Sequence, residues 1–345
     1  LRMSAAGKGE WLPVSGIALG ILPGSGYEPA STPLRPGDVL VLYSDGVTEA
    51  EIPIRVAITV DDSSVEVDFS GTADQVRGNM NAPLAVAESA VYFVIRAVTD
   101  PEIPPNQGAY QPVRVAVPLG SVLNPEPPAA VVGGNVETSQ RVTDVVLSAF
   151  GDAMPGRVPA QGQGTMNNLI VGSRDADGFT YYETIGGGFG GRSSGDGMDG
   201  VQVGMTNTLN TPIEALEMEY PLRVERYGFR PDSGGDGEFR GGLGLERAVT
   251  VEADAVVSLL TERRRTAPAG LAGGEPGTTG ENSIDGETVP AKTTREVPAG
   301  TAVTVKTPGG GGYGDPTDRD AAAIDRDRRE GKVTDSARSG TAAEE

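Results

Sequence analysis

The run YYETIGGGFGGRSSGDGMDGVQVGMTNTLNTPIEALEMEYPLRVERYGFRPDSGGDGEFRGGLG spans Tyr181 to Gly244. Glycine, asparagine and threonine are unusually dense in it. These residues compete with regular backbone pairing and favour caps and turns. A run of this kind is typical of a functional site or of a tightly defined junction between chain segments.

Further motifs of similar composition lie on both sides of this run. In chain order they are VDFSGTADQVRGNMNAP at 67–83, GGNVETSQRVTDVVLSAF at 133–150, GTMNNLIVG at 164–172, TNTLNTPIEALE at 206–217, SGGDGEFRGGLG at 233–244 and TPGGGGYGDP at 307–316. Together they resemble the hydantoinase B/oxoprolinase family across about residues 51–335. This family contains the amide-hydrolysing subunits of ATP-dependent 5-oxoprolinases and N-methylhydantoinases.

The resemblance implies a function and partners. An A-type subunit of this family uses ATP to phosphorylate the carbonyl of a cyclic amide such as 5-oxoproline or a hydantoin, and the B-type subunit opens the activated ring. We therefore expect an A-type ATP-binding subunit and a small cyclic amide as partners. ATP is expected on the A-type subunit, and the family also implies a divalent metal.

Two departures from the family pattern concern histidine, which this chain lacks entirely. Family members carry a further N-terminal portion whose metal site draws on Asp and His, and they often show histidines where this chain has Gln202–Met205. We expect a truncated B-type subunit that is inactive when isolated. A non-catalytic assembly or docking subunit is the alternative.

The first fifty residues show a different likeness. GIALGILPGSGYEPASTPLRPGDVLVLYSDGVTEA, at 16–50, resembles part of a PPM-type serine/threonine phosphatase, in which the residue matching Asp45 helps to hold a divalent metal. Val39–Tyr43 predicts a strand and Ser44–Gly46 a turn. We expect a phosphatase-like segment at 1–50, a hydantoinase B-like region at 51–335 and a disordered tail at 336–345. A phosphatase-related fusion is a third hypothesis.

Composition excludes several classes of function. The chain has 345 residues and a net charge of −20, with 28 basic and 48 acidic residues. Such a surface disfavours nucleic acid and anionic lipid, and salt would screen its self-repulsion, so we predict a halophilic protein. No apolar run is long enough for a membrane span and no basic, apolar leader opens the chain. We expect a cytoplasmic location.

The residues that are missing also limit the chemistry. Without cysteine there is no disulfide frame or thiolate nucleophile, and without histidine there is no Ser-His-Asp catalysis. Catalysis would depend on carboxylates, tyrosine, lysine, backbone amides or a metal held by oxygen.

Hydrophobic periodicity predicts an α+β fold, with mainly antiparallel strands and flanking helices. Strands are expected at 54–60, 65–69, 113–117, 167–171, 179–184, 222–227, 243–251, 255–262 and 297–307, and helices at 82–98, 137–150, 212–218 and 318–330. Polar residues up to Asn81 are expected to cap the first helix. Residues 267–290 are expected to form a glycine-rich surface excursion.

The glycine runs do not fit nucleotide loops. Gly186–Gly191 satisfies G-x-G-x-x-G, but no helix is expected after it, and Gly309–Gly312 lacks a following Lys-Ser/Thr. We predict close backbone packing or an amide nest at both runs.

Pro212 suits the first turn of a helix, with Asn210 or Thr211 as its cap and Glu214 at capping-box distance from Thr211. The same helix end could instead face a polar substrate such as a lactam. The polar residues near strand and helix ends that could line such a pocket are Asn135, Asn167, Glu183, Asn207, Asn210 and Thr211. For the basic cluster Arg263–Arg265, intramolecular pairing and anion binding both remain open.

Overall fold

The computed structural model describes residues 2–3, 9–10, 39–47, 52–173 and 178–334, and the first three of these segments by their backbone alone. The chain divides into two compact units, Leu1–Val158 and Pro159–Glu345. Both combine helices with largely antiparallel sheets, as predicted. The expected tail at 336–345 lies outside the described residues, and the expected boundaries at residues 50 and 335 stay predictions.

Unit 1 is a six-stranded sheet with two long helices packed on it. Its strand order is β2-β1-β3-β4-β5-β6, and among the described strands only the β5–β6 pair is parallel. The strands are β1 Arg2–Met3, β2 Gly9–Glu10, β3 Val39–Val47, β4 Pro53–Val60, β5 Val65–Asp68 and β6 Val113–Ala116. The helices are α1 Leu84–Val98, α2 Gln107–Tyr110 and α3 Ser139–Ala153, the last preceded by a π-type turn, η1 Gly134–Thr138, and followed by the 3₁₀ turn η2 Pro155–Arg157.

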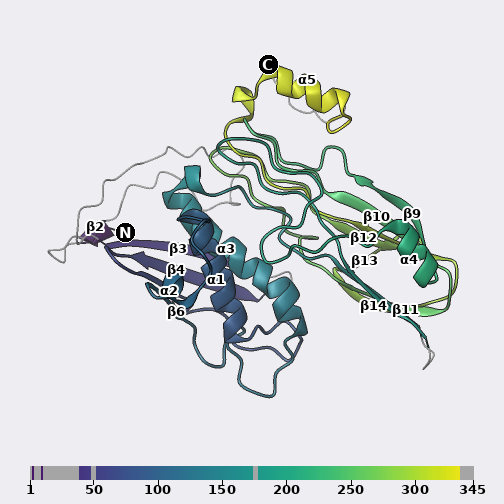
Figure 1. Cartoon of the computed structure of the whole chain (residues 1–345), viewed down its shortest axis with the longest axis horizontal. Helices are drawn as coiled ribbons and strands as arrows, with labels where there is room; N and C mark the ends of the chain where they lie inside the picture. Colours follow the sequence, from purple (N-terminus) through teal and green to yellow (C-terminus); the bar gives the residue numbers. More distant parts are fainter. Residues whose placement is uncertain (1, 4–8, 11–38, 48–51, 174–177, 335–345) are drawn as a thin grey trace. The chain divides into compact units, whose positions relative to one another are not determined.

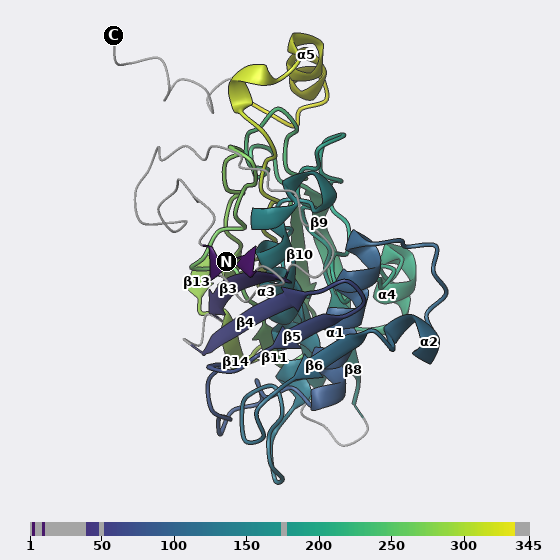
Figure 2. The same ribbon diagram turned by 90° about the vertical axis from the view of Figure 1, so that its left-hand side faces the viewer.

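Alternation in the strands explains the core of unit 1. Ile54, Val56 and Ile58 point to one face of β4 and are buried. The apolar stripe of α1 and that of α3 are buried as well, and Figure 2 shows β4, β5 and β6 side by side with α1 against them. Burial of these two stripes is the main stabilising term for this unit.

Two predictions for unit 1 are wrong. Ser44–Gly46 is not a turn, because β3 continues to Val47 and pairs with β4 over its whole length, Asp45 opposite Arg55. Asn81 does not cap α1, which begins after Pro83 without a side-chain cap. The Asn81 amide instead bonds the backbone of Val76 and two further carbonyls, because the loop before the helix needs its own polar partners.

Unit 2 is a sandwich of two antiparallel sheets (Figure 1). One sheet has the order β14-β11-β7-β8 and the other β13-β12-β15-β10-β9. The strands are β7 Asn168–Ser173, β8 Thr180–Thr184, β9 Leu222–Phe229, β10 Leu245–Val251, β11 Ala255–Leu260, β12 Glu281–Ile284, β13 Glu287–Val289, β14 Lys292–Val297 and β15 Thr301–Lys306. Inward-facing residues of both sheets form one core, including Leu169, Val171, Val249, Val257 and Val303.

Residues 267–290 are not a surface excursion. They include β12 and β13, and Asn282 and Ile284 are buried in the sandwich. The hydrophobic pattern also fails to predict β14, which pairs with β11. The glycines before β12, such as Gly274 and Gly277, resemble loop residues in the sequence, whereas in the fold they pack against the backbone of residues 309–313.

Two helices complete unit 2. Helix α4, Ile213–Glu219, leads into β9, and α5, Ala321–Arg329, follows the 3₁₀ turn η3 Pro316–Asp318. Asp320 caps α5, which ends before Gly331 in the left-handed region, φ 68°. Across both units, no described helix has the length and hydropathy needed to cross a membrane.

Candidate functional site

The glycine runs of unit 2 form a bundle of closely packed backbone segments, here called the glycine bundle: residues 186–191, 234–244 and 309–312. A Cβ on Gly241 would lie 1.9 Å from the Gly310 carbonyl oxygen, and one on Gly188 would lie 2.1 Å from the Gly242 oxygen. Contacts this short with backbone atoms are impossible for any larger residue. The prediction of close backbone packing is confirmed.

The amide groups of the bundle bond to neighbouring backbone carbonyls. Gly310 N donates to Gly242 O at 2.9 Å, Gly235 N to Gly310 O at 2.8 Å and Gly188 N to Pro308 O at 3.0 Å. These N–H groups already donate to backbone carbonyl oxygens, so they are not free to form an anion-binding nest. Among the described residues, the first helix after Gly186–Gly191 is α4, more than twenty residues further on, so these glycines do not open a helix as a dinucleotide loop must.

A buried ion pair joins the two sheets of the sandwich. Glu183 on β8 and Arg247 on β10 both occupy core-facing positions, and Arg247 is 2% exposed. Nε and Nη2 of Arg247 donate to the two Glu183 oxygens at 3.3 and 3.2 Å. Burial raises the pKa of Glu183, and the Arg247 charge opposes that rise. Two charges have thus been placed where the strand pattern otherwise places aliphatic residues.

A bulge in β9 brings Tyr227 to the same site. The register with β10 shifts between Ala248 and Val249, and beyond the shift Tyr227 lies directly opposite Arg247. The guanidinium carbon of Arg247 lies 4.8 Å from the centre of the Tyr227 ring, within cation–π range. Without the bulge, Arg226 would face Arg247 instead, so this irregularity of the strand selects an aromatic neighbour for the cation.

Tyr181 supplies a further hydroxyl to this cluster. Its side chain is 3% exposed, and Glu183, Arg247 and Thr211 are its polar neighbours. Within the described residues, no group makes a hydrogen bond of normal geometry with the Tyr181 oxygen. Burial, and next the Glu183 charge, raises the pKa of Tyr181 to about 12. The hydroxyl therefore keeps its proton at neutral pH and can donate it.

Three of the residues predicted for the pocket meet here, although not as helix caps. Pro212 occupies the cap position of α4, and no side chain caps that helix. Asn210 instead donates to the Tyr227 hydroxyl, and Thr211 lies near Tyr181. The capping-box prediction for Thr211 and Glu214 is wrong, because the side chains before the helix turn towards the sandwich. We call Tyr181, Glu183, Asn210, Thr211, Tyr227 and Arg247 the tyrosine cluster.

The other predicted pocket residues lie outside the tyrosine cluster. Asn167 is fully buried with a φ of 48°, and it bonds Gln163, the Ile185 carbonyl and Arg264. Asn207 is exposed. Asn135 is exposed in η1 of unit 1, where its carbonyl accepts a bond from Ser139.

The basic cluster makes intramolecular bonds, the first of the two possibilities. Arg263 donates to the Ala267 carbonyl and to Gln161, and Arg264 donates to Asn167 and Asn282. These four bonds go to one backbone carbonyl and three side-chain amides. These arginines tie the start of β7 to the end of β11.

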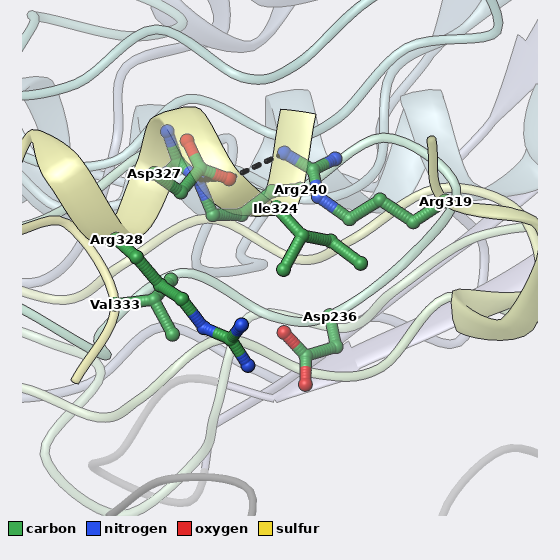
Figure 3. Close-up of a pocket in the computed structure, with 7 residues that line it drawn as sticks. All are labelled: Asp236, Arg240, Arg319, Ile324, Asp327, Arg328 and Val333. Atoms are coloured by element: carbon green, nitrogen blue, oxygen red, sulfur yellow. Dashed lines mark hydrogen bonds and ion pairs between the residues drawn. The ribbon is translucent and has the colours of Figure 1, made fainter. Parts of the chain in front are cut away.

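A second buried charge network attaches α5 to the glycine bundle (Figure 3). Asp327 of α5 accepts from Arg319 at 2.6 Å and lies 3.6 Å from Arg240, which pairs with Asp199 at 3.0 Å. Asp196 receives two bonds from Arg319. The cavity beside these groups measures about 10 Å³, enough for at most one water molecule. This network is structural and offers no room for a substrate.

The divalent metal implied by the family has no obvious ligands in the part of the chain that the structure describes. In that part, no three acidic side chains gather closely enough to hold a metal ion. The Asp45 side chain lies outside the described residues, so its metal role stays a prediction. The described residues alone do not fit a metal centre.

Sequence reasoning missed Arg247, Tyr181 and Tyr227 as site residues. Arg247 was visible as a charge inside the apolar pattern of β10, LERAVTV, at a position equivalent to Leu245 and Val249. Tyr227 could not be found in this way, because its orientation depends on the bulge.

Comparison with known proteins places the chain in a family. The model of the hydantoinase B/oxoprolinase family matches residues 31–316. The chain belongs to this family. It is 45% identical to 5-oxoprolinase 1 of Arabidopsis thaliana over 76% of its own length and 20% of that protein. It is 43% identical to an uncharacterised protein of Methanocaldococcus jannaschii, over 82% of the chain and 50% of the relative. It is 32% identical to a putative B-type D-/L-hydantoinase subunit of Pseudomonas sp., over 85% and 52%.

Solved structures share the fold. An ATP-dependent caprolactamase from Pseudomonas jessenii superposes with a TM-score of 0.74 at 26% identity, covering 86% of this chain and 55% of that one. An acetone carboxylase superposes with a TM-score of 0.71 at 17% identity, covering 86% and 48%, which is a likeness of fold alone. The chain spans about half or less of the relatives it matches.

The family match does not support the phosphatase resemblance at residues 1–50. It begins at residue 31, upstream of the junction expected near residue 50. The pairing of β3 with β4 also crosses that junction. Most of the motif with Asp45 thus falls inside the hydantoinase B match.

Proposed function

We propose that this chain is the B-type part of an ATP-dependent hydrolase that acts on small cyclic amides such as 5-oxoproline or hydantoins. The observation that carries the proposal is the family match over residues 31–316. The relatives named as a 5-oxoprolinase and as a B-type hydantoinase subunit, together with the likeness to a caprolactamase, support the choice of substrate class.

The chemistry requires two parts. A ring amide is a poor electrophile, and transfer of a phosphoryl group from ATP to its oxygen makes the ring carbon easier for water to attack. Water adds to that carbon, the C–N bond breaks and the nitrogen takes a proton, which leaves an acyl phosphate. A second water then releases phosphate and gives the open-chain carboxylate. The sequence of this chain contains no Walker-type phosphate loop, so the proposal assigns ATP to an A-type partner.

The test is reconstitution. The full chain and an A-type subunit are purified separately and together, and ring opening of 5-oxoproline and hydantoin is measured with ATP consumption. We expect turnover only in the mixture and none from the isolated chain. Equal turnover by the A-type subunit alone would contradict the proposal. A stable complex with no turnover for any cyclic amide would favour the alternative, a docking subunit without catalysis.

The proposal also places the protein in the cytoplasm, where an A-type partner and ATP would meet it. The net charge of −20 fits a high-salt cytoplasm, since salt screens self-repulsion. A melting temperature that rises with potassium chloride concentration would agree with this part of the proposal, and a constant one would oppose it.

A further inference from the structure

The tyrosine cluster combines features that a purely structural ion pair does not need. A buried pair between two sheets can be stable when both partners are satisfied. Here the Tyr181 hydroxyl is buried beside the pair with Glu183, Arg247 and Thr211 around it, yet it makes no hydrogen bond of normal geometry with any described residue. A buried, unsatisfied hydroxyl is costly and indicates that something else completes its bonding.

We propose that Tyr181, Glu183, Arg247 and Tyr227 bind the amide edge of a small cyclic amide, with the segment 206–212 as its cover. The choice of ligand class rests on the proposed function, and the place and the residues rest on the geometry. In a small ring the amide is held cis, so its N–H and C=O point out along the same edge. The cluster offers the complementary pair, an acceptor in Glu183 and donors in Arg247 and Tyr181.

The donors and acceptors have capacity left after pairing with each other. Each carboxylate oxygen of Glu183 accepts one bond from Arg247 and retains a lone pair. Arg247 uses two of its five N–H groups on Glu183, and the Tyr181 hydroxyl lies beside the same guanidinium. The two bonds, at 3.2 and 3.3 Å, are longer than the roughly 2.8 Å of a well-formed charged pair. The Arg247–Glu183 ion pair can therefore shift to bond a ligand at a small cost in free energy.

Aromatic rings supply the walls for a flat ligand. Tyr227 stacks under the Arg247 guanidinium, and the rings of Tyr181 and Tyr220 lie 5.0 Å apart between centres. Phe179, just before β8, extends this group, with its ring centre 6.3 Å from that of Tyr220. Small binding sites commonly combine such apolar walls with a few convergent polar groups.

The segment 206–212 covers the cluster but is weakly attached. No backbone N–H or C=O of residues 207–211 bonds to another described residue, and Leu209 in its middle is 91% exposed. Its side-chain contacts with the cluster are the bond from Asn210 to the Tyr227 hydroxyl and the approach of Thr211 to Tyr181. Segments with few backbone bonds open at low free energy, so a ligand can enter by displacing this one.

The test measures binding on the isolated full chain. The probe is 2-pyrrolidone, which has both groups of the amide edge, and the comparison compound is N-methyl-2-pyrrolidone, which lacks the N–H. Saturation-transfer NMR titrations give both affinities. Loss of a bond to a charged group should weaken the comparison compound roughly tenfold or more. Absence of saturable 2-pyrrolidone binding, or equal affinities for the two compounds, would overturn the proposal.

Two neighbouring tyrosines separate binding from structure. Tyr181→Phe removes the hydroxyl proposed to bind the ligand and should weaken 2-pyrrolidone binding about two- to tenfold. Tyr182→Phe removes a hydroxyl that donates to Asn168 on the outer face of the same strand, and the affinity should not change. Unchanged affinity in Tyr181→Phe would mean that Tyr181 is only a core residue and would refute the assignment.

Failure here and failure of the proposed function would look different. Ring opening with an A-type partner, but no 2-pyrrolidone binding by this chain or no effect of Tyr181→Phe on it, would place the substrate elsewhere and leave the function intact. Binding at the cluster with no turnover in the reconstituted mixture would leave the site intact and contradict the function.

Discussion

The glycine bundle and the tyrosine cluster lie in the same unit and solve the problem of buried polarity in opposite ways. In the bundle, backbone groups of residues such as Gly188, Gly242 and Gly310 take part in hydrogen bonds between chain segments. The segments can approach closely enough for these bonds because glycine has no side chain. In the tyrosine cluster, large polar side chains meet with long bonds, and the Tyr181 hydroxyl is unsatisfied among the described residues. A region whose backbone groups bond to one another is built for rigidity, whereas a buried side-chain hydroxyl without a bond of normal geometry indicates a place that can receive a partner.

The largest expected effect is in the glycine bundle. Gly241→Ala places a Cβ 1.9 Å from the Gly310 carbonyl oxygen, a backbone atom that cannot move without breaking the neighbouring hydrogen bonds. We expect a loss of more than about 4 kcal/mol in the free energy of unfolding, or no folded protein. Urea denaturation and the soluble yield measure it.

Gly228→Ala is the matched control, since a Cβ there meets nothing within 4 Å. Alanine in a strand should be neutral or slightly stabilising relative to glycine. If both variants unfold at the same urea concentration, close packing is not the reason for the glycines.

The second expected effect concerns the attachment of α5 to the bundle. Asp327→Ala leaves Arg319 and Arg240 buried with one partner fewer. Removal of one partner from a buried charge network costs about 3–5 kcal/mol. Asp325→Ala, on the exposed side of the same helix and 4.0 Å from Arg328, should cost less than about 1 kcal/mol. Equal costs in thermal unfolding would show that the buried network adds nothing.

Much of this architecture was predictable, because it follows from local patterns. Alternation in β4 and helical spacing in α1 and α3 predicted those elements to within a few residues. The failures are all non-local. Asn81 has the composition of a cap but bonds to a distant segment, and Thr211 lies beside Tyr181 instead of capping its helix. Strands β12 and β14 are separated by residues that resemble loops.

The candidate site was only partly predictable for the same reason. Glu183 stands out as a charge in a core-facing position, and Asn210 and Thr211 as polar residues before a proline. Which residues they meet depends on the pairing of two different sheets and on the β9 bulge, and neither is encoded within a short window of sequence. Asn135 and Asn167 were predicted for the pocket on the same grounds, as polar residues near strand or helix ends, and both lie outside the tyrosine cluster.

A third effect is a dependence on pH, through Asp196 and Asp199. Burial alone would raise their pKa values, but Arg319 beside Asp196 and Arg240 beside Asp199 lower them below the usual 3.8. A carboxyl whose pKa is depressed by folding stabilises the protein above its unfolded value, and this stability is lost as the pH falls through the folded pKa.

Wild-type chain and an Asp196→Asn, Asp199→Asn variant are compared by urea denaturation between pH 6 and pH 3. The variant should be less stable at pH 6, and the difference should shrink below about pH 4. A difference that stays constant with pH would argue against the depressed pKa values.

The smallest expected effect compares Tyr181 and Tyr182, which are neighbours on β8 but face opposite sides of the strand. Tyr182 donates its hydroxyl to Asn168 at 2.7 Å, so Tyr182→Phe should cost about 0.5–1.5 kcal/mol, the usual net value of a hydrogen bond. Tyr181 is the more buried of the two, yet its hydroxyl has no bond of normal geometry to lose among the described residues. Tyr181→Phe should therefore be neutral or stabilising in urea denaturation, although burial alone predicts the opposite order. If Tyr181→Phe destabilises the chain more than Tyr182→Phe, the Tyr181 hydroxyl already has a partner in the folded protein, and the tyrosine cluster is a finished part of the core like the glycine bundle.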